Sequence, residues 1–259
     1  MKILGHPTWV KLPPRGRPVV VLLHGALSSS ASMLRSIGPG LSKSFSVGAF
    51  DRRGHGRSAD SAEPFTYEAM AEETIAFIEL LGRRVHLIGH SDGGNVALLV
   101  AQRRPDVLQR VVVVGANYHF RGLLDFPLLE VDTPDFERWA AKYALHAPEG
   151  KAHAREVLLK TNEMLRTGPT MSVADLGEIA VPILVLAGDD DVSTLDHTTM
   201  MFESIPDAQL AIIPGASHAV LKERTRDCVR IIRRFLRQKG PVVTYSPLRR
   251  AGPGEFPGD

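Results

Sequence analysis

Residues 85–97 combine a short apolar run, a glycine-rich turn and a helix-compatible run within thirteen positions. The apolar run, residues 85–88, is short enough for a buried strand, and the turn that follows has the form Gly-x-Ser-x-Gly. A strand and a helix joined this tightly nearly touch, so only residues without a β-carbon fit where Gly89 and Gly93 stand. The pattern predicts Ser91 at the tip of the turn, in a strained backbone conformation, with its hydroxyl lifted above a helix N-terminus.

Other apolar runs resemble strands that are buried on both faces. They are residues 19–23, 46–50, 111–114, 182–187 and 210–213. Up to residue 117 the pattern reads strand, strand, helix, strand, helix, strand. Such alternation predicts an α/β fold, with a mostly parallel sheet of about seven to eight strands and helices on both faces. Residues 1–18 contain four prolines and can hold one short edge strand around residues 8–12, so we expect a reduced edge.

The pattern changes between residues 118 and 180, where the apolar runs become short and four prolines interrupt them. Phe136, Trp139, Ala140 and Tyr143 fall on one helical face. A segment of roughly sixty residues can scarcely hold a core of its own. We therefore expect residues 118–180 to form a helical cap inserted into a core of residues 1–117 and 181–238. Residues 239–259 have four prolines, four glycines and no periodicity, which predicts a flexible C-terminal tail.

Composition excludes several classes of partner. The chain has 31 basic and 29 acidic residues, a balance that does not favour nucleic acid or an anionic membrane. No apolar window reaches transmembrane length, and the single cysteine, Cys228, allows no intramolecular disulfide. No spacing of His, Cys, Asp or Glu indicates a metal site. We expect a cytoplasmic monomer or homodimer that acts on a small molecule.

Three polar groups follow strand-like runs in the order Ser91, Asp191, His218. This is the nucleophile, acid, base order of the α/β-hydrolases, and the chain resembles that family over nearly its whole length. The segment that begins His24-Gly25 resembles the family's oxyanion loop, residues 51–58 its post-strand turn, and residues 188–191 its acid loop. The resemblance implies a serine hydrolase on an α/β-hydrolase fold.

The chemistry assigns a role to each group. A serine hydroxyl needs a base to take its proton during attack, and His218 is the candidate. Asp191 would hold the other ring nitrogen; Asp189 and Asp190 are rivals, but the family spacing from Gly188 favours Asp191. The oxyanion needs two N–H donors. One is expected from the backbone of Asp92, and the other from Ala26 or Leu27, of which the family pattern favours Ala26. The reaction requires no cofactor.

The aspartate after the nucleophile has two interpretations. Ser-Asp-Gly-Gly, with Gly-Ala-Asn after the next strand, resembles the valacyclovir-hydrolase-like (biphenyl-hydrolase-like) branch, in which this Asp receives the substrate's α-ammonium group. Alternatively, Asp92 complements the dipole of the helix that it begins. Leu27, Asp92, Asn117 and Trp139 are the candidate substrate contacts. We expect His90 to be a filler under the sheet end, and His119 and His197 to lie on the surface or in a pocket wall.

The expected function is hydrolysis of a carboxylic ester, or a related acyl bond, of a small molecule through an acyl-enzyme. One alternative is an amino-acid ester hydrolase that uses Asp92. Others are a carbon–carbon bond hydrolase or a lactonase, because the same triad serves those reactions. A slow or non-catalytic small-molecule receptor on the same fold is the alternative from another class, because fold alone does not fix function.

Overall fold

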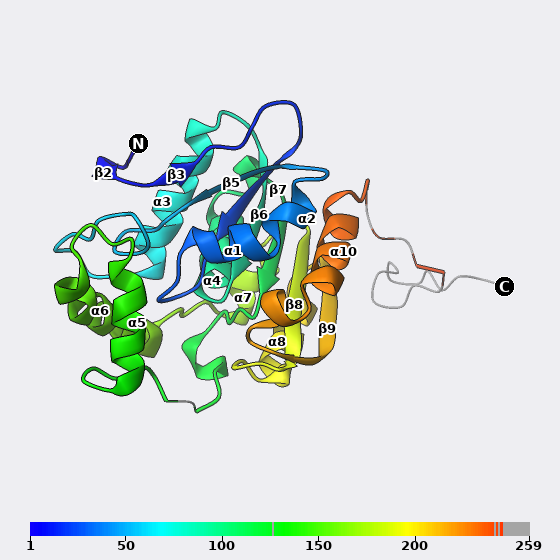
Figure 1. Ribbon diagram of the computed structural model, residues 1–259. Helices are drawn as coiled ribbons and strands as arrows, with labels where there is room; N and C mark the ends of the chain where they lie inside the picture. Colours follow the sequence, from blue (N-terminus) through cyan, green and yellow to red (C-terminus); the bar gives the residue numbers. More distant parts are fainter. Residues whose placement is uncertain (126, 241, 243, 246–259) are drawn as a thin grey trace.

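The computed structural model describes residues 1–125, 127–240, 242, 244 and 245. In this part of the chain the main sheet has seven strands in the order β3-β5-β4-β6-β7-β8-β9, and all are parallel except β3 (Figure 1). The strands are β3 (Val10–Lys11), β4 (Val19–Leu23), β5 (Ser46–Phe50), β6 (Val85–His90), β7 (Leu108–Val114), β8 (Ile183–Asp190) and β9 (Ala208–Ser217). The predicted mostly parallel sheet is confirmed.

The N-terminal edge of the sheet is short, as expected. Strand β3 pairs antiparallel with β5 through only two residues. Ahead of it, β1 (Lys2–Ile3) and β2 (His6–Pro7) form a separate two-stranded hairpin. The prolines between β3 and β4 cannot donate to a ladder, which keeps them out of regular strands.

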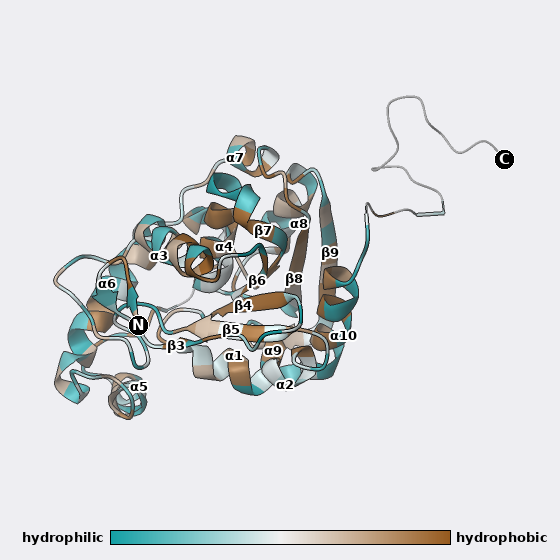
Figure 2. Ribbon diagram, turned by 90° about the horizontal axis from the view of Figure 1, so that it is seen from above, coloured by the Kyte–Doolittle hydropathy of each residue, from teal (hydrophilic) through white to brown (hydrophobic). Residues whose placement is uncertain are grey.

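Helices cover both faces of the sheet because the strands are apolar on both faces. Alternate side chains of β4 point to opposite sides, with Val21 in one apolar cluster and Leu22 in the other. The first cluster includes α3 (Tyr67–Leu80), α4 (Asp92–Arg103), α7 (Val173–Gly177) and α8 (Leu195–Ser204). The second includes α1 (Ser30–Ser36), α2 (Gly38–Leu41), α9 (Val220–Glu223) and α10 (Thr225–Leu236). Figure 2 shows the hydrophobic strands between these two layers.

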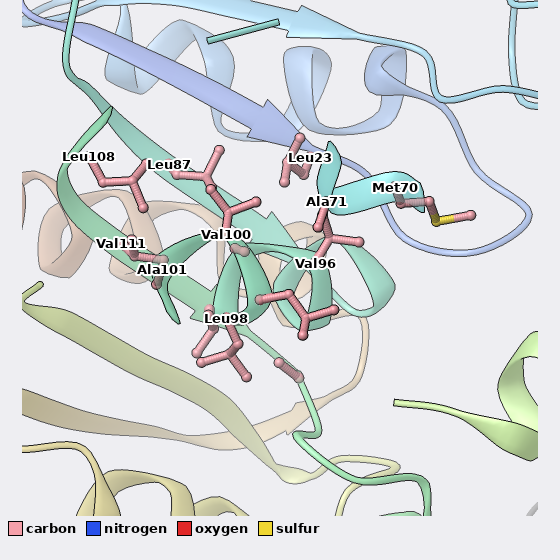
Figure 3. Packing of buried hydrophobic residues seen from close by; sticks show 14 of the residues in the cluster. Leu23, Met70, Ala71, Leu87, Val96, Leu98, Val100, Ala101, Leu108 and Val111 are labelled. Carbon is pink, nitrogen blue, oxygen red and sulfur yellow. The ribbon is translucent and has the colours of Figure 1, made fainter. Parts of the chain in front are cut away.

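Helix α4, which follows the Gly-x-Ser-x-Gly turn, is packed in the middle of the first cluster. Figure 3 shows Val96 and Val100 of α4 beside Leu87 of β6 and Ala71 of α3, and all four side chains are buried. A helix held this firmly on both sides gives the turn at its N-terminus a fixed position.

The prediction that the first two buried strands follow each other without a helix is wrong. Helices α1 and α2 lie between β4 and β5. Neighbouring parallel strands require a crossover connection, and these helices provide it. Both are short, and a serine-rich start and a Gly-Pro-Gly sequence hide their periodicity.

Residues 118–180 contain η2 (Phe120–Gly122), α5 (Pro134–Ala144), η3 (Lys151–His153), α6 (Ala154–Thr167) and α7, while η1 (Pro105–Val107) precedes β7. Helices α5 and α6 lie together at one side of the sheet (Figure 1). The end of this segment packs into the core, where Leu176 and Ile179 join the cluster of α4. Among the described residues, no helix combines the length and apolarity needed to cross a bilayer. Most of the predicted tail, residues 241, 243 and 246–259, lies outside the described residues.

Candidate active site

Ser91 occupies the tight turn between β6 and α4. Its φ of 55° and ψ of −127° lie in a region that a residue with a side chain rarely adopts, which confirms the predicted strain. A β-carbon built on Gly89 would lie 1.9 Å from the carbonyl oxygen of Gly93, and one on Gly93 would lie 2.2 Å from that of Leu23. The close approach of strand and helix therefore requires both glycines.

The three groups that follow strands in the sequence meet at one edge of the sheet. Nε2 of His218 lies 3.0 Å from Oγ of Ser91, and Nδ1 of His218 lies 2.6 Å from Oδ1 of Asp191. Ser91 follows β6, Asp191 follows β8 and His218 follows β9. Because parallel strands present their carboxyl ends on the same side, residues more than a hundred positions apart come within hydrogen-bond distance.

The carboxylate of Asp191 is almost fully shielded from solvent, with its side chain 1% exposed. Burial by itself raises the pKa of this carboxyl, but the hydrogen bond and charge of His218 and the backbone N–H groups at Val192 and Gly188 outweigh it. The resulting pKa of Asp191 lies below the usual value. Its rivals face elsewhere: Asp189 accepts a hydrogen bond from the backbone N–H of Ala216, and Asp190 is exposed.

Gly115 is a site residue that the sequence analysis did not single out. It follows β7 with a φ of 56°, and a β-carbon there would lie 2.9 Å from Nδ1 of His218 and 3.0 Å from Oδ2 of Asp191. Any side chain at this position would push the two groups apart. The signal in the sequence is a glycine at a strand end, but its partners are distant in the chain.

His90 is not the filler that the sequence suggested. Its Nε2–H donates to the backbone carbonyl of His218 at 2.9 Å, and the two ring centroids are 5.0 Å apart. Burial, followed by the charge of His218, lowers the pKa of His90 to about 4, so the ring is neutral near pH 7. His90 therefore holds the backbone of the predicted base in place.

The expectation that His197 lies on the surface or in a pocket wall is wrong. The ring is buried and stacks on Tyr118 with 3.9 Å between centroids, and Nε2 accepts a hydrogen bond from the backbone N–H of Tyr118. It anchors the start of the segment after β7 to α8. His119 is half-buried and accepts a hydrogen bond from the backbone N–H of Arg121.

The loop after β4 lies against Ser91 because β4 and β6 are neighbours. A β-carbon on Gly25 would lie 2.9 Å from Cβ of Ser91. Ala26 and Leu27 line the same cavity as Ser91. The carbonyl of Leu27, whose φ is 50°, accepts a hydrogen bond from Nε1 of Trp139 at 2.9 Å, so α5 is tied directly to this loop.

A cavity of about 220 Å³ opens beside Ser91, under residues 123–165. Leu123, Leu128, Leu129 and Leu165 give it apolar walls. Of the predicted substrate contacts, Leu27, Asp92 and Asn117 line this cavity, whereas Trp139 lines an outer groove instead.

The carboxyl of Asp92 is buried at the cavity wall, in the first turn of α4. Its Oδ1 accepts a hydrogen bond from the hydroxyl of Tyr67 at 2.8 Å, and its Oδ2 has no hydrogen-bond partner among the described residues. Burial raises its pKa above the usual value, although the charge of Arg52 and the Tyr67 hydrogen bond oppose the shift. Nothing in the sequence near Asp92 pointed to Tyr67 or to Arg52.

A second polar pair braces the cavity floor. The Nδ2 group of Asn95 donates to Oδ1 of Asn117 at 3.0 Å, and the backbone N–H of Asn117 donates to Oδ1 of Asn95 at 2.8 Å. This reciprocal pair joins α4 to the loop after β7. Asn117 is thereby fixed in orientation, with its amide already bonded.

Comparison of the sequence with known proteins identifies a family for this chain. The model of the alpha/beta hydrolase family matches residues 20–231. A putative carbamate hydrolase RutD of Caulobacter sp. (strain K31) is 28% identical over 230 residues, covering 80% of this chain and 85% of its own. A putative esterase/lipase of Haemophilus influenzae is 26% identical over 244 residues, covering 85% and 83%.

Solved structures show the same fold. A serine hydrolase involved in carbazole degradation (CarC) superposes with a TM-score of 0.75 at 21% identity, covering 90% of this chain and 96% of its own. The enol-lactonase of Burkholderia xenovorans LB400 gives a TM-score of 0.72 at 23% identity, covering 91% and 98%. The strand order, the strained serine turn and the matched span of 212 residues lead to one conclusion: the chain belongs to the alpha/beta hydrolase family.

Proposed function

We propose that this protein is a serine hydrolase that cleaves a carboxylic ester, or a related acyl bond, of a small molecule through an acyl-enzyme. The observation that carries the proposal is the unbroken hydrogen-bonded chain from Ser91 through His218 to Asp191 at the wall of a cavity. A nucleophile, a base and a buried acid in line are the three members of the triad that serves this chemistry.

In the proposed reaction, Nε2 of His218 takes the proton of Ser91 as Oγ attacks the carbonyl carbon. Asp191 stabilises the imidazolium and holds the ring in the required orientation. The imidazolium then returns the proton to the leaving oxygen, and the acyl group remains on Ser91. A water molecule, deprotonated by His218, attacks the acyl-enzyme; the imidazolium then returns this proton to Oγ of Ser91 as the acid leaves.

The oxyanion is assigned to the backbone N–H groups of Ala26 and Asp92. Two observations support this assignment: the loop of Ala26 lies against Ser91, and Asp92 begins α4, whose first N–H groups have no acceptor within the helix. The reaction proceeds with these groups alone, so the proposal includes no cofactor.

The names of relatives widen the range of acyl bonds. Relatives named carbamate hydrolase or esterase would cleave bonds in which a carbonyl carbon carries a leaving oxygen or nitrogen. A lactone or an activated carbon–carbon bond would use the same triad. We place the ester first, because the cavity walls are largely apolar. We further propose that the protein works in the cytoplasm as a monomer or homodimer on freely diffusing substrate.

The test is hydrolysis of p-nitrophenyl butyrate by the wild type, by Ser91→Ala and by Ser204→Ala, a partly exposed serine on α8. Turnover should fall by about 10³-fold or more in Ser91→Ala, because the nucleophile is gone, and stay unchanged in Ser204→Ala. Activity that survives in Ser91→Ala would overturn the proposal. A single slow labelling of Ser91 without turnover would favour the receptor alternative.

An amino-acid ester is a second candidate substrate, because two buried acceptors in the cavity lack donors. Oδ2 of Asp92 is one. The other is Oδ1 of Asn162: its Nδ2 donates to the carbonyl of Leu129 at 2.8 Å, so the oxygen faces away from that bond without a partner in the described part of the chain. An α-ammonium group supplies donors to both.

This second candidate is tested by comparing an aminoacyl p-nitrophenyl ester with p-nitrophenyl butyrate. Asp92→Asn should lower kcat/KM for the aminoacyl ester by about tenfold or more relative to the plain ester, because a charged contact is lost. Equal losses on both esters would remove the ammonium interpretation and leave the esterase proposal intact.

A further inference from the structure

A second cavity, distinct from the apolar one, also reaches Ser91. It has a volume of about 340 Å³ and lies against α1 and α9, with Ser91, His90 and His218 in its wall. The two cavities share Ala26, Ser91 and His218, so the nucleophile stands between them. A substrate whose scissile carbonyl sits at Ser91 can therefore place one half in each.

The second cavity continues outward into a groove of about 420 Å³ between α1 and α5. The two have Ser28, Ser32 and Lys222 in common. We call this continuous space the access groove. The bond from Trp139 to the carbonyl of Leu27 holds α5 beside α1 and so fixes the width of the groove.

Three cations from three different elements face the access groove: Arg35 of α1, Lys142 of α5 and Lys222 of α9. His146 and the hydroxyls of Ser28, Ser29 and Ser32 also line it. Every residue that lines it lies in the described part of the chain, and not one of them is an Asp or a Glu. In a chain with 29 acidic residues, an acid-free wall is a local property and does not follow from composition.

The cations of the access groove also differ from their neighbours in pairing. On the same helix as Lys142, Arg138 pairs with Asp135, and Lys151 nearby pairs with Glu137. Within the described residues, neither Arg35 nor Lys142 nor Lys222 takes part in an ion pair. Three exposed charges of one sign that form no ion pair within the described residues favour an anion along the route to Ser91.

Resting on the proposed function, we infer that the natural substrate carries an anionic group, such as a carboxylate, phosphate or sulfonate, on its alcohol portion. The acyl portion enters the apolar cavity under residues 123–165. The alcohol portion extends through the access groove, where Lys222 is nearest to Ser91 and Arg35 and Lys142 lie farther out. The charge speeds encounter and fixes the orientation of the ester in the site.

The test compares two acetate esters that differ in charge and have phenols of similar acidity, 4-acetoxybenzenesulfonate and 4-acetoxybenzamide. The wild type should prefer the sulfonate in kcat/KM by about tenfold at low ionic strength, and the preference should shrink in 1 M salt, where the Debye length is about 3 Å. Lys222→Gln and Lys142→Gln should each lower the preference by about two- to five-fold.

Lys43→Gln is the matched control. Lys43 is exposed and lies just before β5, at the amino end of the strands, away from the groove. It should leave the preference unchanged. Equal rates for the two esters, or a preference that all three variants keep, would overturn the inference while leaving the serine mechanism intact. Failure of both esters to turn over at Ser91 would instead overturn the proposed function.

Discussion

At the scale of single residues, the charge on Asp191 is the most constrained feature of the site. The side chain is 1% exposed, and the ring of His218 and nearby backbone N–H groups are what keep its pKa low. Asp191→Asn keeps the shape but removes the charge that, in the proposed mechanism, stabilises the imidazolium. We expect kcat for ester hydrolysis to fall by about 10³- to 10⁴-fold with the fold retained.

The control for this variant is Asp190→Asn, which changes the exposed neighbour in the same run of aspartates. Its kcat should equal that of the wild type, and circular dichroism should show both variants folded. If Asp190→Asn lost activity and Asp191→Asn kept it, the acid would be misassigned.

The residues that meet at the site were predictable where a local pattern encodes them. The order Ser91, Asp191, His218 and the glycines around Ser91 identified the groups that the structure brings together. The contacts of His90 and Gly115 could not be predicted in this way. Both act on His218, more than a hundred residues away, and no local pattern reports such a contact.

At the scale of elements, a buried carboxylate fastens α6 to the core. The Oδ2 of Asp60 accepts hydrogen bonds from Nε2 of His153 at 2.8 Å and from Nζ of Lys160 at 2.9 Å, and its side chain is 2% exposed. The same Lys160 donates to the backbone carbonyl of Ser61 at 2.6 Å. Burial opposes ionisation of Asp60, but the bonds from Lys160 and His153 lower its pKa below the usual value.

Asp60→Asn should therefore loosen η3 and α6, because His153 and Lys160 lose the charged carboxylate that accepts their hydrogen bonds. We expect hydrogen exchange in residues 151–167 to speed up by about tenfold, with KM for the ester raised more than kcat is lowered. The comparison variant is Asp132→Asn, whose exposed pair with Arg155 should contribute little. Equal exchange in both variants would contradict the role of Asp60.

The elements themselves were unequally predictable. Helix α5 could be predicted because its aromatic residues fall on one face. Helices α1 and α2 are too short, and too rich in serine and glycine, to show a helical periodicity of apolar residues. The contacts of Asp60 could not be predicted from the sequence, because they join a loop after β5 to a helix some ninety residues later.

At the scale of the whole molecule, five histidines are held in the neutral form. Burial, the main cause in each case, lowers their pKa values, to about 4 for four of them and well below 6.5 for the fifth; they are His55, His86, His90, His197 and His24. Above about pH 6.5 the folded and unfolded forms are both neutral there. Below that pH the unfolded chain binds protons first, so the free energy of unfolding should fall as the pH drops from about 6.5 to about 4.

His86 offers a test outside the active site. It is 4% exposed and packs edge-on against Phe45 at 5.6 Å between centroids. His86→Leu removes one proton-binding group, so the slope of unfolding free energy against pH should be shallower by about 1.4 kcal/mol per pH unit in this range. Urea unfolding at several pH values measures it. An unaltered slope in His86→Leu would contradict the account.

The sheet as a whole was the most predictable feature, because apolar runs with buried faces define its strands. The apolar runs do not encode the spatial order of those strands. In the structure β4 lies between β5 and β6, and this order depends on pairing between strands that are far apart in the chain. The same strand order brings Gly25 next to Ser91. The geometry of the site therefore depends on strand order, which no local sequence pattern encodes.

The bond between Trp139 and the carbonyl of Leu27 has a consequence for recombination among relatives. Exchanging residues 118–180 for the equivalent stretch of another hydrolase replaces the leucines that wall the apolar cavity. The exchange should therefore change which substrates fit the cavity. The exchange also removes the indole that restrains the loop beside Ser91. A chimera should therefore recover its rate only if the donor stretch brings its own N–H to that carbonyl, so selectivity and turnover would be inherited together.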